Sequence, residues 1–325
     1  MNLILESLKK DILELRKHLN FIEHLKVDIL STSENYEYSM SSSKRKFEYN
    51  SIIISLYGLV ENYIEKFCFE YIEIIEKIIP AYNVLEPKFV ENHFALSIQL
   101  VSKVIENKHL KFSNVSKENV INNLNSCIFN NTNYKLNKEA FTINTGNLKH
   151  SKICETVGFL NIKVDEKLRK FDCFNINTEN TFNKIDDLVQ RRNEIAHGNV
   201  QDILDMTAVI PFVDFIEKYL TSIGQILKDE IIRINNNYEK DYCSILISDT
   251  IFFNGNIIGT VKGSELNLKN GDEILIEKAD NSVKRSKIID ARDFKDKGVT
   301  IKLNKNIKKT DKFYKLIGTQ HLAIS

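Results

Sequence analysis

Residues 45–79 read RKFEYNSIIISLYGLVENYIEKFCFEYIEIIEKII, and this single stretch indicates a mainly helical protein. Its apolar side chains recur at steps of three and four residues, which is the period of one buried face on an α-helix. Pro80 follows directly and ends the pattern, because proline lacks the N–H that a continuing helix needs. The predicted helix is long enough to span a helical bundle.

Shorter helical patterns flank this one on both sides. A polar, serine-rich connector is expected to run from the end of the first helix through Ser43, and Pro211 is tolerable in the first turn of the last helix. Residues 130–177 are polar and interrupted, and their pattern predicts no order of elements. The predicted helices cover residues 2–31, 87–106, 117–128, 180–197 and 210–234.

The composition changes after the last of these helices. Only five glycines lie in residues 1–238, whereas six lie in residues 239–325, together with alternating patterns such as Val299-Thr300-Ile301. Turn sequences at 254–256, 269–272 and 297–298 separate five to seven short predicted strands. We therefore expect a helical domain over 1–238, with its core at about 45–235, and a small all-β barrel domain over 239–325.

Composition and charge exclude several classes of protein. The 325 residues are 42% hydrophobic and carry a formal net charge of +1, so neither general disorder nor a global attraction to nucleic acid is expected. The longest run without charge, residues 119–134, is too short and polar for the roughly 20 apolar residues of a membrane span. Acidic Glu6 does not fit a cleavable leader. We expect a soluble, cytoplasmic protein that does not contact membranes.

The local signatures of cofactor enzymes are missing from the sequence. No phosphate-binding loop, dinucleotide-binding turn or esterase elbow occurs. The five cysteines form no metal knuckle and are expected to be reduced and structural. His93, His109 and His150 have no partner at the spacing of metal ligands, so no metal site and no cofactor are predicted.

The densest polar motif is residues 191–198, RRNEIAHG, at the end of the helix predicted over 180–197. Asn193 and His197 are four apart and share a helix face, while Arg192 is separated from His197 by about 140° and about 7.5 Å. Gly198 suits the position just past a helix end. The alternative to a functional role is that His197 only caps the last carbonyls of the helix.

This motif resembles the signature of the HEPN superfamily of ribonucleases, in which an arginine and a polar residue precede a histidine. Arg192, Asn193 and His197 match it position by position. Residues 56–61, LYGLVE, are similar to the Tyr-Gly-x-x-Glu helix of one bacterial branch of that superfamily. The resemblance covers roughly residues 45–235 and implies a helical bundle.

The resemblance also implies an activity, which is metal-independent cleavage of RNA through its own 2′-hydroxyl. Arg192, Asn193 and His197 would then be catalytic. Since one chain offers a single histidine here, two motif helices are expected to meet in a homodimer that forms a composite active site. Tyr57 and Glu61 are candidates to position Arg192, and Arg191 is a further supporting candidate. For Glu61 the alternative is an ordinary ion pair on the helix surface, and for Tyr57 a core aromatic.

Two functional hypotheses follow from the motifs. The first is a toxin or antiviral-defence endoribonuclease that acts on an RNA substrate, with an antitoxin or an activator as a further partner. The second is a catalytically inactive HEPN dimer that binds RNA or protein.

The predicted barrel carries a local excess of positive charge. Residues 282–315 hold 12 Lys and Arg against 4 Asp and Glu. Basic side chains interspersed with aromatic ones are suited to following a phosphate backbone, although an ordinary lysine-rich surface explains them as well. The candidates for RNA binding are Lys284, Arg285, Lys287, Lys308 and Lys309.

Overall fold

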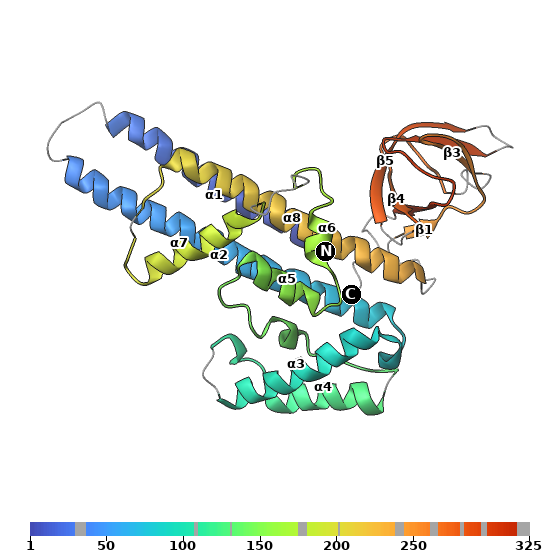
Figure 1. Cartoon of the computed structure of the whole chain (residues 1–325), viewed down its shortest axis with the longest axis horizontal. Helices are drawn as coiled ribbons and strands as arrows, with labels where there is room; N and C mark the ends of the chain where they lie inside the picture. The colour runs from blue at the N-terminus through green and yellow to red at the C-terminus, as the bar shows by residue number, and fades with distance from the viewer. Residues whose placement is uncertain are drawn as a thin grey trace. The chain divides into compact units, whose positions relative to one another are not determined.

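The computed structural model has a helical part followed by a small antiparallel sheet, which confirms the predicted fold class (Figure 1). It divides into two compact units, Met1–Lys228 and Asp229–Ser325. The domain boundary predicted between 238 and 239 falls outside the residues that the structure describes. Those are residues 1–29, 37–106, 110–130, 132–174, 181–200, 202–237, 244–260, 266–279, 283–293 and 298–316.

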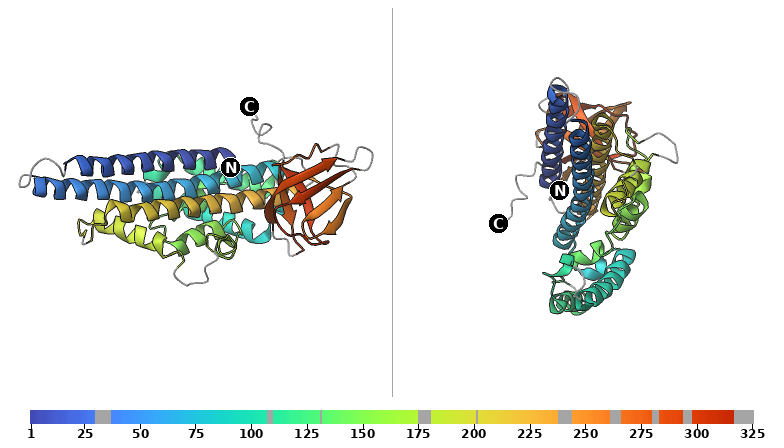
Figure 2. Two further views of the ribbon diagram at one scale, coloured as in Figure 1. Left: turned by 90° about the horizontal axis from the view of Figure 1, so that it is seen from above. Right: turned by 90° about the vertical axis from the view of Figure 1, so that its left-hand side faces the viewer.

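Three long helices of the first unit run side by side (Figure 2): α1 (Asn2–Ile29), α2 (Glu37–Ile78) and the first part of α8 (Met206–Asn237). Their facing side chains are almost fully buried. Gly224 of α8 marks the closest approach, since a Cβ at that position would lie 2.7 Å from Leu5 and 2.9 Å from Phe67. Any larger residue there would therefore push the three helices apart. The shared core includes Leu8, Ile12, Ile53, Leu56, Val60, Val213, Ile216 and Leu220.

Two helix boundaries differ from the predicted ones. Helix α2 begins at Glu37, so part of the expected serine-rich connector is helical. Adding residues to an existing helix costs little, since nucleation is the expensive step, and a polar segment can therefore extend it. Helix α8 begins at Met206, which places Pro211 beyond the first turn instead of within it.

Shorter helices pack around the three long ones. Helices α3 (Pro87–Glu106) and α4 (Lys117–Phe129) form a pair, and α7 (Asn183–Ala196) lies against α2 (Figure 1). The segment whose order the sequence did not predict contains η3 (Lys138–Thr142), α5 (His150–Gly158) and α6 (Val164–Leu168). Two further single turns are η1 (Tyr82–Val84) and η2 (Leu110–Phe112). No helix in the described part of the chain is long and apolar enough to span a bilayer.

The second unit is a curled seven-stranded antiparallel sheet in the order β1-β7-β4-β5-β6-β3-β2. Gly255 and Gly271 have φ values of +53° and +89° in the predicted turns, a conformation that glycine adopts without a Cβ penalty. The long strand β5 pairs with β4 and then, past a bulge, with β6, so one strand bends the sheet around its core. The strands are β1 (Ser244–Leu246), β2 (Thr250–Asn254), β3 (Ile257–Thr260), β4 (Glu273–Glu277), β5 (Val283–Asp293), β6 (Val299–Leu303) and β7 (Lys312–Leu316).

The sheet buries side chains on both of its faces. Ile274 and Ile276 point into its own apolar core, while Leu275, which alternates with them, packs with Tyr314 and with Ile232 of α8. The last turns of α8 therefore belong to the second unit.

Candidate active site on helix α7

Helix α7 is fixed by one buried wall and ends at the polar motif. Ile185, Leu188 and Val189 are buried. The polar residues of the motif therefore lie on the other faces of the helix. At its end, the N–H of Gly198 donates to the carbonyl of Ile195 and the N–H of Asn199 donates to that of Glu194. With Gly198 at φ +73°, this is the Schellman arrangement that closes a helix.

Arg192 points back onto α2, where Tyr57 supports it. The guanidinium carbon lies 4.9 Å from the centre of the Tyr57 ring, within range of a cation–π contact. One guanidinium nitrogen also donates to the side-chain carbonyl of Asn193, at 3.0 Å. The structure thus brings together three of the predicted residues, Arg192, Asn193 and Tyr57.

Tyr57 contacts Glu61 on the same helix and Leu148 in the segment before α5. Its hydroxyl donates to Oε1 of Glu61, at 2.7 Å, and accepts the backbone N–H of Leu148, at 3.3 Å. Burial, and then the hydrogen bond to Glu61, raise the pKa of the Tyr57 hydroxyl to about 12, so it remains a neutral donor. Glu61 therefore contacts the hydroxyl of the tyrosine whose ring lies beside Arg192.

Arg191 engages a separate set of partners. It donates to the hydroxyl of Tyr49 at 2.9 Å, pairs with Asp187 at 3.1 Å and reaches the carbonyl of Asp202 at 3.3 Å. Its side chain is only 14% exposed. These contacts hold α7 against α2 and the following loop, and none of them involves Arg192 or His197. The adjacent arginines therefore have different surroundings.

His197 lies at the end of α7 and is exposed. Its backbone N–H donates to the carbonyl of Asn193, at 3.0 Å, and the residue lines a surface pocket of about 430 Å³. Both charge signs are present at this pocket, which is open enough for a polar ligand. The residues that line it are Lys149, Gln190, Asn193, Glu194, His197 and Asn199.

Sequence analysis missed Lys149 and the segment around it. Three consecutive residues contact the site region: the N–H of Leu148 reaches Tyr57, Lys149 lines the pocket, and the N–H of His150 donates to Asp186 at 2.8 Å. No periodic signal marks this segment, because it is a loop held by contacts to residues that are distant in sequence.

One group of metal-ligating side chains also escaped the sequence analysis. His150 and Cys154 on α5 lie beside Asp165 on α6, with one ligand atom of each within 4.8 Å of the others. The statement that His150 has no partner at metal-ligand spacing was wrong, because Cys154 follows it by four residues, which is one helical turn. That spacing was the available signal.

Three of the basic candidates of the second unit are exposed. Lys287 on β5 is exposed, as are Lys308 and Lys309 in the turn before β7, while Lys284 and Arg285 belong to β5. Their role in RNA binding stays a prediction.

The fold and the motif together define a helical protein with an Arg-Asn-x-x-x-His helix end. Comparison with protein families matches residues 6–229 to RiboL-PSP-HEPN. The chain therefore belongs to this HEPN family, which confirms the predicted resemblance and points to RNA cleavage or RNA binding as the class of function. No curated protein and no solved structure matches the chain.

Proposed function

We propose that this protein is a metal-independent endoribonuclease of the toxin or antiviral-defence kind. The observation that carries the proposal is the arrangement at the end of α7, where a supported arginine and an exposed histidine lie five residues apart. The guanidinium of Arg192 rests on Tyr57, and the imidazole of His197 borders a pocket open to solvent. Family membership supports the same class of chemistry.

Each of these residues suits one part of the reaction. Cleavage needs a base that takes the proton of the 2′-hydroxyl, so that this oxygen attacks the phosphorus, and an acid that protonates the departing 5′-oxygen. The products are a 2′,3′-cyclic phosphate and a 5′-hydroxyl. Arg192 offers a planar fork to the phosphate oxygens, on which charge accumulates. His197 transfers the protons, and Asn193 donates to the phosphate or orients the histidine.

A second copy of the chain would complete the site. One motif helix supplies a single histidine, whereas the reaction uses a base and an acid, so a two-fold dimer that apposes two α7 ends provides both. Such a dimer needs an exposed helix surface near the motif, on which the second copy can pack.

Helix α2 offers that face beside Tyr57. Phe47 and Ile54 are 73% and 51% exposed, and Gly58 follows one turn later with no atom within 4 Å of where its Cβ would be. Glycine inside a helix costs about 0.5–1 kcal/mol relative to alanine, and no contact in the described part of the chain requires it here. A close approach by a partner helix would account for a glycine at this position.

The products of cleavage test the proposal directly. RNA incubated with the purified protein without added divalent metal should yield cyclic-phosphate ends, which RNA ligation after cyclic-phosphatase treatment would detect. His197→Ala and Arg192→Ala should each remove this activity while leaving the circular dichroism spectrum unchanged. Cleavage by His197→Ala at the wild-type rate would exclude His197 from catalysis.

Growth of cells that express the protein distinguishes an enzyme from an inert binding module. An active ribonuclease should slow growth, and the Arg192→Ala, His197→Ala double variant should not. Equal growth together with equal RNA binding by both proteins would support the second hypothesis, a catalytically inactive HEPN dimer.

A further inference from the structure

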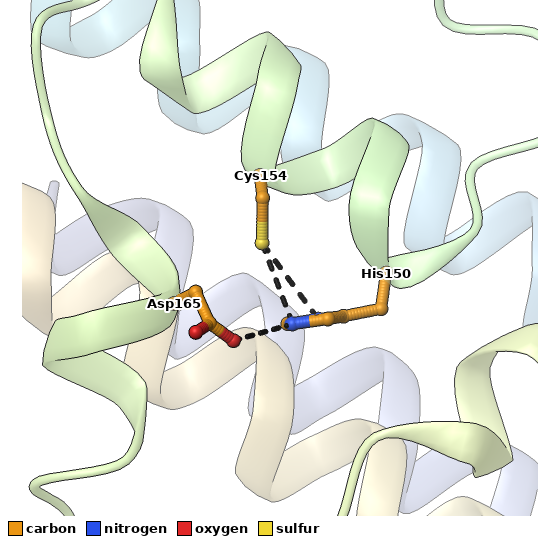
Figure 3. A group of neighbouring side chains, drawn as sticks. All are labelled: His150, Cys154 and Asp165. Atoms are coloured by element: carbon orange, nitrogen blue, oxygen red, sulfur yellow. Dashed lines mark hydrogen bonds and ion pairs between the residues drawn. The ribbon is translucent and has the colours of Figure 1, made fainter. Parts of the chain in front are cut away.

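His150, Cys154 and Asp165 direct their side chains toward one point between α5 and α6 (Figure 3). Nε2 of His150 lies 2.9 Å from Oδ1 of Asp165 and 3.4 Å from Sγ of Cys154. The side chain of His150 is 16% exposed and that of Asp165 is 42% exposed, so the point of convergence is half-buried. The three atoms are an imidazole nitrogen, a thiol sulfur and a carboxylate oxygen.

The geometry does not fit a nucleophile–base–acid relay. In such a relay the nucleophile and the carboxylate contact opposite nitrogens of the imidazole. Here Sγ and Oδ1 both approach Nε2 most closely, while Nδ1 is 2.8 Å from the hydroxyl of Tyr219.

Two of the three separations are close to those around a tetrahedral metal ion, and the third pair, Sγ of Cys154 and Oδ1 of Asp165, lies within 4.8 Å. Zinc bound about 2.3 Å from sulfur and about 2.0–2.1 Å from nitrogen or oxygen separates a sulfur and a nitrogen by about 3.6 Å, and a nitrogen and an oxygen by about 3.3 Å. The observed separations of 3.4 Å and 2.9 Å differ from these by a few tenths of an ångström. A small outward rotation of the Asp165 side chain would accommodate the ion.

His150 and Asp165 each contact a further residue that can orient them as metal ligands. The Tyr219 hydroxyl contacts Nδ1, so it can fix the tautomer that leaves the Nε2 lone pair free, and the ring stacks on Phe182 with 4.0 Å between centroids. Asp165 uses its other oxygen, Oδ2, to accept from Arg169 at 3.0 Å. Oδ1 therefore remains available to an ion while Oδ2 keeps its partner.

We propose that His150, Cys154 and Asp165 bind one Zn²⁺ ion, with the fourth position open to water. The mixed sulfur, nitrogen and oxygen set suits a borderline-soft divalent ion rather than Mg²⁺ or Ca²⁺, which prefer oxygen alone. The ion links α5 to α6 and thereby fixes the segment that begins α5, where Leu148 contacts Tyr57 and Lys149 lines the pocket. This inference does not depend on ribonuclease activity, since metal binding is measured by itself.

Cobalt serves as the probe, because Co²⁺ occupies zinc sites and reports a thiolate ligand by charge-transfer absorption. Full-length protein stripped with a chelator should bind one Co²⁺ per chain with this absorption, and Zn²⁺ should displace it. Cys154→Ser should lose the absorption, and Asp165→Asn should bind at least tenfold more weakly. Tyr219→Phe, which only removes the contact to Nδ1, should weaken binding by about tenfold.

Control variants outside the three proposed ligands show whether the ion binds at this site. Cys173→Ser, at an exposed cysteine in the same unit, should retain full binding, as should His197→Ala. Hydrogen exchange should slow in α5 and α6 when Zn²⁺ is added. The proposal is overturned if the folded wild type binds no stoichiometric ion, if Cys154→Ser and Asp165→Asn bind as tightly as wild type, or if His197→Ala abolishes binding.

Discussion

The guanidinium of Arg192 and the ring of Tyr57 are stacked at 4.9 Å, and the hydroxyl of the same tyrosine donates to Glu61 at 2.7 Å. Arg192 and Tyr57 are separated by most of the helical unit in sequence, on α7 and α2. The tyrosine is 3% exposed, so the arginine rests on a ring that is itself packed into the helical unit.

Tyr57→Phe separates the two contributions of this tyrosine. The ring under Arg192 is retained, while the hydroxyl that joins Glu61 to the N–H of Leu148 is lost. We expect the free energy of unfolding to fall by about 1–2 kcal/mol, because a buried N–H loses its partner. Urea unfolding measures this loss. Tyr57→Leu should in addition weaken phosphate binding, seen as a higher KM for RNA, and equal KM values for both variants would contradict a role for the ring.

The neighbouring arginines should give opposite results when replaced by lysine. Arg191→Lys removes the fork that joins Tyr49, Asp187 and Asp202, so we expect the free energy of unfolding to fall by about 1–3 kcal/mol with the cleavage rate of the folded enzyme retained. Arg192→Lys should lower kcat by on the order of 100-fold and change stability little. Thermal unfolding and single-turnover cleavage, measured on both proteins, check the pair. A catalytic defect confined to Arg191→Lys would reverse the assignment.

Stability should fall in mild acid because of His93. This residue is fully buried, its Nε2 accepts the N–H of Asn137 at 3.0 Å, and its Nδ1 meets the hydroxyl of Tyr82 at 2.9 Å. Burial lowers its pKa from 6.5 to about 4. Between these values the unfolded chain binds a proton that the folded chain does not. The stabilisation is therefore complete above pH 6.5 and decreases as the pH falls toward 4, by roughly 3 kcal/mol in total.

Urea unfolding at pH 7 and pH 4.5 measures this effect. The difference in unfolding free energy between the two pH values should be smaller in His93→Gln than in wild type by roughly 2–3 kcal/mol. His18→Gln, at an exposed position on α1, is the matched control and should keep the wild-type difference. An unchanged pH dependence in His93→Gln would assign the acid sensitivity to other groups.

A charged substitution at Ile54 tests the proposed dimer face on α2. Ile54→Asp should prevent association and reduce the cleavage rate, because an unpaired carboxylate cannot be buried against a partner helix. Ile98→Asp on α3 is a close control, since Ile98 is 49% exposed and Ile54 is 51% exposed. Light scattering should report half the wild-type mass for Ile54→Asp only. A dimeric and fully active Ile54→Asp protein would remove α2 from the interface.

The amino-acid sequence was sufficient for the six longer helices, though not for α5 and α6, and for the motif at the end of α7. Apolar side chains at three- and four-residue steps define a helix with one buried face, and Gly198 marks a helix end, because both signals are local in the chain. The start of α2 was less well predicted, since a polar segment can extend a helix without any apolar signal, and α8 begins four residues before its predicted start at Ile210.

The contact partners of the polar side chains depend on the tertiary structure and could not be predicted from the sequence. Nothing in residues 191–198 distinguishes Arg191, which is bound to Tyr49, from Arg192, which rests on Tyr57. The convergence of His150 and Cys154 with Asp165, and the contact of Leu148 with Tyr57, likewise join separate elements. Helical periodicity specifies which face of an element is buried, but the neighbour that this face meets depends on how distant segments pack together.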